Sequence, residues 1–137
     1  MAQEIRRVDY YYAIVPDKPG EAARILSVLH QAGVNLLGFC GFPAARKSQL
    51  DFLPEDSAAF AQVARKAGLK LSKKKTVFLI QDDDRPGAGA ELVGKLAEAG
   101  VNVTSLQAVC AGAGRYGAML WVKPADLKKT AKALGAA

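Results

Sequence analysis

Hydrophobic and polar positions follow the same order twice along the chain. Each time, a short apolar run rich in aromatic and β-branched residues precedes a stretch whose apolar positions recur at helical spacing. The apolar runs, residues 10–15 and 76–80, have the composition of strands. The helical stripes consist of Ile25, Leu26, Leu29 and Ala32 in the first copy and of Leu92, Val93, Leu96 and Ala99 in the second.

The two copies form an internal repeat. Residues 17–36 align with residues 84–103, and nine of the twenty aligned positions are identical. Both segments begin with Asp-Lys/Arg-Pro-Gly, which predicts a helix start with proline near the first helical position. Both helices are expected to end at a glycine, Gly33 or Gly100, in the left-handed conformation. A second strand is expected directly after each of these glycines.

The rest of each copy completes a β-α-β-β-α-β unit. Third strands are expected at 50–53 and 116–122, each followed by a second helix that opens with proline. Residues 69–71 are a candidate fourth strand for the first copy, whereas that of the second copy is missing or supplied from elsewhere. We therefore predict the α+β class, with two tandem ferredoxin-like units at 1–72 and 73–137 and antiparallel sheets that carry helices on one face.

The first strand of the first copy is apolar on both of its faces. Alternate side chains of residues 10–15 point to opposite sides, and both sets are hydrophobic or aromatic. Since helices cover one side of such a sheet, we expect the other side to be covered by the second copy or by a second chain. The alternative is an open face with exposed tyrosines.

The repeated motif resembles that of the ACT domain. The resemblance is carried by Asp17–Gly20 and Asp84–Gly87, each after a strand, and by the Ala-Gly-Val-Asn that ends each helix. It covers nearly the whole chain, as residues 8–72 and 75–135. It implies a stand-alone pair of small regulatory modules that bind an amino acid or a related metabolite where two modules meet. Such modules are often attached to a metabolic enzyme, and this chain has no room for a catalytic domain, so the resemblance implies a regulatory protein and not an enzyme.

The resemblance also implies a ligand-binding site at the loop before each first helix and at the start of each second strand. By matching motif positions, its residues are Asp17, Pro19, Gly20, Asn35 and Leu36 in the first copy and Asp84, Pro86, Gly87, Asn102 and Val103 in the second. The chemistry fits a zwitterion, because a helix N-terminus attracts a carboxylate and an aspartate receives an ammonium. The alternative is that Asp, Pro and Gly form only a tight turn and a helix start.

Composition excludes several classes of protein. The 137 residues are 50% hydrophobic and 23% charged, which is typical of a globular domain and not of a disordered or fibrous chain. No apolar run approaches the roughly 18 residues of a membrane span, and the start of the chain has no signal-peptide core. We therefore expect a cytoplasmic protein without a membrane partner.

Cysteine and histidine are scarce. Two cysteines, Cys40 and Cys110, are too few for a disulfide scaffold, and we expect both to pack in the core or at a strand edge. The single histidine, His30, argues against a metal site and against histidine-based catalysis. The run Asp82–Asp84 lacks the spaced ligands of a calcium loop. We expect no catalytic residue, no metal and no cofactor.

Two other functions remain as alternatives. A docking subunit without its own ligand differs from a sensor only in having a partner, such as a metabolic enzyme. An RNA-binding module shares the order of elements and suits the net charge of +6, but residues 114–121 match the third-strand motif poorly and argue against nucleic acid. The lysines at 73–75 and 128–132 are expected to be solvated. We also expect a homodimer that forms through sheet edges or faces.

Overall fold

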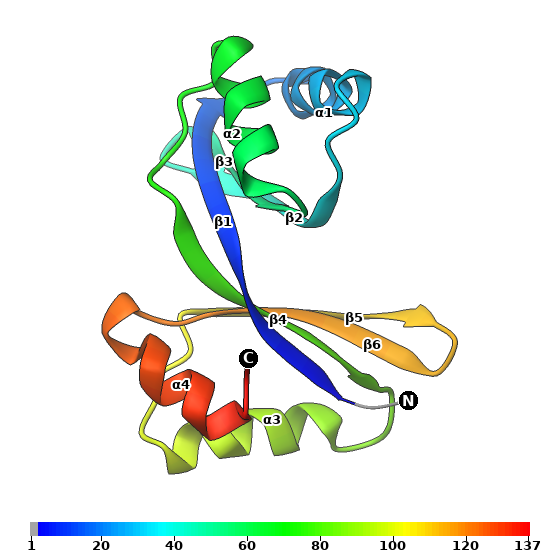
Figure 1. Cartoon of the computed structure of the whole chain (residues 1–137), viewed down its shortest axis with the longest axis vertical. Coiled ribbons are helices and arrows are strands. Elements are labelled where there is room, and N and C mark those ends of the chain that lie inside the picture. The colour runs from blue at the N-terminus through cyan, green and yellow to red at the C-terminus, as the bar shows by residue number, and fades with distance from the viewer. Residues whose placement is uncertain (1–2) are drawn as a thin grey trace. The chain divides into compact units, whose positions relative to one another are not determined.

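The computed structural model describes residues 3–137 as two compact units, drawn as ribbons in Figure 1. One unit is Asp9–Lys75. The other unit consists of two pieces of the chain, the described residues up to Val8 and Thr76–Ala137. Each unit has its own hydrophobic core, so each is described by itself.

The unit Asp9–Lys75 contains strands and two helices that enclose an aromatic core. Its elements are the second part of β1 (Glu4–Pro16), α1 (Glu21–Gln31), β2 (Leu36–Ala44), β3 (Lys47–Pro54) and α2 (Ser57–Lys66). Strand β3 is central and pairs antiparallel with both β1 and β2. In the core between sheet and helices, the ring of Phe60 lies 5.2 Å from that of Phe52 and 5.3 Å from that of Tyr11. The predicted helices on one face are confirmed here.

The other unit repeats this plan. Its elements are β4 (Lys75–Asp83), α3 (Ala88–Glu98), β5 (Ser105–Gly112), β6 (Arg115–Trp121), a short 3-10 turn η1 (Pro124–Asp126) and α4 (Leu127–Leu134). Strand β6 pairs antiparallel with β4 and β5, and α3 and α4 lie together on one face of these strands (Figure 1). Phe78, Leu96 and Leu120 are fully buried between the two layers. The predicted α+β class is confirmed.

The N-terminal part of β1 supplies the fourth strand of the unit Thr76–Ala137. The hydrogen-bonded order of the strands is β2-β3-β1-β4-β6-β5, so β1 is the neighbour of β4. Ile5 is buried in the same core as Phe78, and its carbonyl accepts a hydrogen bond from the Ala137 N–H at 3.3 Å. The division of the chain therefore differs from the predicted one at 72/73, because burial of Ile5 joins the start of the chain to the second copy.

Residues 69–71 form no strand, which corrects the prediction of a fourth strand there. The Ser72 N–H donates to the Tyr12 carbonyl at 2.8 Å. The Tyr12 N–H, however, donates to the Ser72 hydroxyl at 2.9 Å and not to a backbone carbonyl. A side chain thus takes the place of the next ladder hydrogen bond, and regular pairing does not develop.

Both first helices start after a glycine and not at the proline. Gly20 and Gly87, at φ 89° and 86°, are the N-caps, so the helices begin at Glu21 and Ala88. The predicted helix starts are therefore moved by two residues, because the left-handed glycine must finish the turn before helical geometry begins. The two glycines predicted to end these helices have φ values of 73° and 72°, which confirms the left-handed ends.

The two faces of β1 differ in burial within the unit Asp9–Lys75. Ala13 and Val15 point to the helices and are buried. On the opposite face Tyr10 is buried, but Ile14 is 45% exposed and Phe42 of β2 is 39% exposed. Ile14 and Phe42 lie at the same end of this sheet, and covering of this face by the other copy or by a second chain stays a prediction.

Candidate functional site

A surface groove of about 200 Å³ in the unit Thr76–Ala137 contains part of the predicted site. The groove is formed by the end of β4, the first turn of α3, strand β5 and the start of β6. Its lining residues are Asp84, Arg85, Ala88, Gly89, Ala108, Val109, Cys110 and Tyr116. Pockets for drug-sized ligands have volumes of about 300–1,000 Å³, so this groove suits a smaller molecule, of the size of an amino acid.

The turn before α3 positions the groove. The Asp84 N–H donates to the Gly114 carbonyl at 2.8 Å, which ties this turn to the hairpin between β5 and β6. Gly87 then leads the chain into α3, whose first turn has no side-chain cap among the described residues. The first N–H groups of a helix have no acceptor within the helix, and its dipole favours an anion at this end. The start of α3 can therefore receive a carboxylate.

Asp84 and Cys110 interact at one wall of the groove. A hydrogen bond between the Cys110 thiol and the Asp84 carboxylate raises the pKa of the thiol, and desolvation adds to this rise. The thiol is therefore protonated at neutral pH and acts as a hydrogen-bond donor, not as a nucleophile. Together with Ala108 and Val109 it forms an uncharged wall beside a single carboxylate.

The other charged groups near the groove are paired. Arg85 forms an ion pair with Glu91, and this contact raises the pKa of Arg85 and lowers that of Glu91. Arg115 pairs with Asp83 at 2.8 Å, and the hydrogen bond lowers the pKa of that carboxyl. In the part of the chain that the structure describes, no ion pair involves Asp84. Its carboxylate can therefore accept an ammonium group in addition to the Cys110 thiol.

The matching turn of the first copy meets a different neighbour. The Lys18 N–H donates to the Pro16 carbonyl at 3.1 Å, and Pro19 and Gly20 complete the turn that leads into α1. The Ser48 hydroxyl donates to Asp17 Oδ1 at 3.2 Å. The carboxylate at this position is thus already hydrogen-bonded to strand β3.

The structure separates the aspartate and the asparagine of the first copy. Asn35 Nδ2 donates to Glu55 Oε2 at 3.2 Å, and the Asn35 carbonyl accepts from the Glu55 N–H at 3.0 Å. Leu36 pairs with Pro54, the last residue of β3, whereas Asp17 lies at the start of that strand. The eight residues of β3 span roughly 23 Å. A ligand of amino-acid size cannot contact both ends within this unit.

The second copy shows the same separation. Asn102 and Val103 precede Ser105, which pairs with Trp121 at one end of β6. Asp84 follows Asp83, which pairs with Arg115 at the other end of β6. The seven residues of β6 span roughly 20 Å. Val103 also packs against the hydrophobic core. Of the predicted residues, the groove therefore contains Asp84, and Pro86 and Gly87 lie in the turn beside it. Asn102 and Val103 do not line the groove.

The lining residues that the motif did not predict come mainly from the hairpin of β5 and β6. They include Val109, Cys110 and Tyr116. The motif lies on the first strand and helix of the copy, so it carries no information about the segment that faces it. The order of strands does carry this information, since the first and third strands of a β-α-β-β-α-β unit are neighbours.

Two further features of residues 3–137 concern a metal site and a membrane span. In this range, no cluster of three His, Cys, Asp or Glu side chains is arranged to hold a metal ion. The run Asp82–Asp84 makes separate contacts instead, because Asp82 accepts from Gln3 at 2.9 Å while Asp83 pairs with Arg115. Over the same residues, no helix is both long enough and apolar enough to cross a membrane.

Comparison with known proteins identifies solved structures of the same fold. No family model and no curated protein matches the chain. Protein BT0572 from Bacteroides thetaiotaomicron is 18% identical, has a TM-score of 0.83, and aligns over 96% of this chain and 88% of its own. The ligand-free regulatory subunit of aspartate kinase from Thermus thermophilus is 14% identical, with a TM-score of 0.66 and coverage of 98% and 93%.

A third structure, the regulatory subunit of aspartate kinase from Thermus flavus, is 16% identical, with a TM-score of 0.61 and coverage of 98% and 94%. These regulatory subunits contain ACT units. The chain has the tandem ACT fold. At these identities the likeness is one of fold, and the chemistry of this protein rests on its own residues.

Proposed function

We propose that this tandem ACT protein binds an amino acid or a related metabolite and regulates another protein in response. The groove at Asp84 carries the proposal, because it combines a carboxylate, the start of α3 and an uncharged wall. A bound amino acid would direct its carboxylate to the N–H groups of α3 and its ammonium to Asp84. The small residues Ala88, Gly89 and Ala108 leave room for its side chain.

A regulatory role, and not a catalytic one, agrees with the chemistry of the groove. Its lining includes neither histidine nor lysine, and its cysteine is held protonated by a neighbouring carboxylate. The groove therefore lacks a histidine or lysine base and a reactive thiolate. The two similar structures from Thermus are regulatory subunits, which supports the same role for this fold.

A second copy of the chain would complete the site. Strand β5 is an edge strand without charge or proline, and Val109 on it is 70% exposed. If the β5 strands of two copies pair antiparallel, the start of one strand lies beside the end of the other. Asn102 and Val103 of one protomer would then approach the Asp84 groove of its partner. We propose this homodimer as the arrangement that the ligand stabilises.

The melting temperature against a panel of the twenty amino acids tests ligand binding. A ligand present at 100 times its dissociation constant stabilises the native state by about 2.7 kcal/mol, which is a rise of several degrees. Asp84→Asn should remove the rise, and calorimetric titration should show at least a tenfold weaker affinity. The matched control Asp17→Asn, in the first copy, should keep the affinity. Absence of a rise with every compound, or equal loss in both variants, would contradict the assignment.

The dimer has a separate test. Val109→Lys places a charge on the exposed edge of β5 and should convert the dimer to a monomer in light scattering, with weaker ligand binding as a result. Val93→Lys, at a position on α3 that is 39% exposed, is the control and should leave the mass unchanged. A monomeric wild-type protein that binds its ligand would contradict the paired arrangement.

A further inference from the structure

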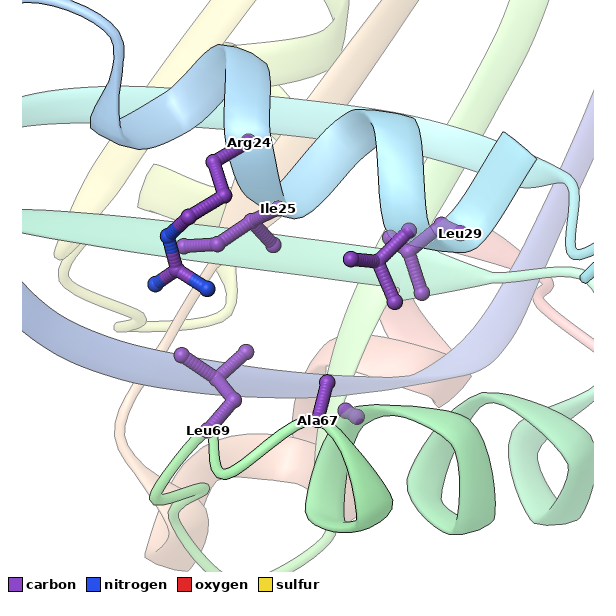
Figure 2. Close-up of a pocket in the computed structure, with 7 residues that line it drawn as sticks. Arg24, Ile25, Leu29, Ala67 and Leu69 are labelled. Carbon is purple, nitrogen blue, oxygen red and sulfur yellow. The ribbon is translucent and has the colours of Figure 1, made fainter. Parts of the chain in front are cut away.

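An apolar groove runs between α1 and α2 in the unit Asp9–Lys75, and Figure 2 shows its deep end. There Ile25 and Leu29 of α1 point toward Ala67 and Leu69 at the end of α2. This deep end encloses only about 10 Å³, while the adjoining shallow part has about 410 Å³. Val28 and Ala67 line both parts, so they form one continuous surface.

Small residues keep this surface open. Ala32, Ala64 and Ala67 lie where longer side chains would fill the space between the helices. Ile25 and Leu29, 4% and 2% exposed, close the floor. From Arg24 to Ala32 the helix rises about 12 Å, or a little over two turns. A furrow of this length between two helices matches the ridge of side chains on a third helix.

Cations border the groove. Arg24 lines its deep end and Lys66 its shallow part. Glu21 is the acid of this region, and it is already paired with Arg24 at 2.6 Å. Arg65, Lys66 and Lys70 are exposed and form no ion pair with any residue of 3–137. The cations at the end of α2 therefore remain available to an acidic partner.

We propose that this groove binds an acidic amphipathic helix of a partner protein. Aliphatic residues one and two turns apart on that helix would contact Val28, Val63 and Ala67. Glutamates beside them would face Lys66 and Lys70. The proposal is independent of ligand binding at Asp84, because every residue it uses belongs to the unit Asp9–Lys75.

The shape of the groove favours a helix over an acyl chain. Both ligands can combine apolar surface with negative charge. An acyl chain, however, needs a deep tunnel that removes most of its surface from water, and the deep end here has room for no more than about one water molecule. The open part is shallow and broad, which suits the side of a helix.

Two designed peptides of 18 residues test this proposal on the full-length protein. They share one face of Leu and Ala at helical spacing, and the opposite positions are Glu in one peptide and Lys in the other. The acidic peptide should bind saturably, at least tenfold more tightly than the basic one. Amide chemical shifts should move at Val28, Ala32, Val63 and Ala67, and the affinity should fall several-fold between about 50 and 300 mM salt.

Substitutions locate the binding surface. Ala67→Trp fills the groove and should weaken binding at least tenfold, and Lys66→Glu should weaken it three- to tenfold. Lys128→Glu, on the exposed surface of α4, changes the net charge equally and should leave the affinity within twofold. Because tryptophan can disturb the packing of the helices, the exposed Lys66→Glu provides an independent test.

Four results would overturn the proposal. These are no saturable shift with the acidic peptide at 1 mM, equal binding of both peptides, shifts that map away from α1 and α2, and equal loss in Lys66→Glu and Lys128→Glu. Decanoate is included as a further probe. If it moves the same amides at lower concentration than the acidic peptide, the groove is an acyl-chain site and not a helix site.

Discussion

The two copies of the repeat form the same turn, and they differ in what that turn meets. In each, a left-handed glycine leads into a helix of eleven residues. In the first copy Asp17 is hydrogen-bonded to Ser48 of β3, whereas in the second Asp84 lies in a groove beside Cys110. The motif thus fixes the backbone of the turn, and the hairpin packed beside it determines which side chain the aspartate contacts and whether it lines a groove.

The largest expected effect on stability concerns the fourth strand of each copy. The second copy has such a strand, the start of β1, whereas residues 69–71 of the first copy form none. Ile5 is 7% exposed and completes the core of the unit Thr76–Ala137. Ile5→Ala should lower the free energy of unfolding by about 2–5 kcal/mol, since it removes buried methyl groups and leaves a cavity. Urea denaturation measures the loss, and hydrogen exchange should accelerate mainly in residues 76–137.

Ile14→Ala is the control on the same strand. Ile14 is 45% exposed, so this substitution should cost less than about 1 kcal/mol. Equal losses for the two variants, or faster exchange confined to residues 9–75 in Ile5→Ala, would contradict the assignment of the start of β1 to the second copy.

The next effect tests whether the two turns are equivalent. Gly20→Ala and Gly87→Ala should each destabilise the protein by about 1–2 kcal/mol, because a Cβ is strained at their φ values of 89° and 86°. A Cβ at either position meets no atom within 4 Å, so the cost is conformational and should be the same in both. Thermal unfolding measures it.

Gly89→Ala is the matched control for these two variants. Gly89 lies within α3 in open space, so alanine there should stabilise the protein by about 0.5–1 kcal/mol. If Gly87→Ala lowers the stability several times more than Gly20→Ala does, the two turns are not equivalent.

A smaller effect distinguishes two aspartates by its dependence on pH. Burial raises the pKa of Asp51 above 3.8, although a hydrogen bond from Gln49 opposes the rise. Ionising Asp51 therefore destabilises the folded protein once the pH exceeds the pKa of the unfolded state. Asp51→Asn should raise the melting temperature at pH 7, and this gain should vanish as the pH falls below about 3.9.

Asp83 should respond in the opposite direction. The hydrogen bond from Arg115 lowers the pKa of Asp83 below 3.8, so its contribution is present at neutral pH and is lost as the pH falls through that lowered pKa. Asp83→Asn should lower the melting temperature slightly at pH 7 and have no effect in strong acid. The same sign for both variants at pH 7 would contradict the two assigned environments.

The smallest effect on stability is at Cys110, where reactivity is the informative measurement. The Asp84 carboxylate disfavours the thiolate, so Asp84→Asn should lower the pKa of Cys110 and speed its alkylation by iodoacetamide at pH 8. Asp17→Asn should leave the rate unchanged. Cys40 is buried and should react slowly in every variant, which makes it an internal control. An unchanged rate in Asp84→Asn would show that the two side chains do not interact.

Local features were predictable because they depend on residues close together in the sequence. The helical stripe that includes Ile25 and Leu29 predicted α1, and both residues are buried in its core. The helix-ending glycines followed from the cost of a left-handed conformation for other residues. By contrast, the strand expected at 69–71 is absent, because the Ser72 hydroxyl occupies the Tyr12 N–H and no periodicity reveals such a bond.

The sequence by itself determined the repeat, the order of the elements and the two glycine turns, because side-chain spacing and backbone preference act over a few residues. Only the tertiary structure decided that Ile5 completes the core of residues 76–137 and that Asp84 meets Cys110 and not Asn102. Both outcomes depend on which distant strands pair and in what register. The free energy of that pairing comes from burial and hydrogen bonds summed over whole strands, which no short motif contains.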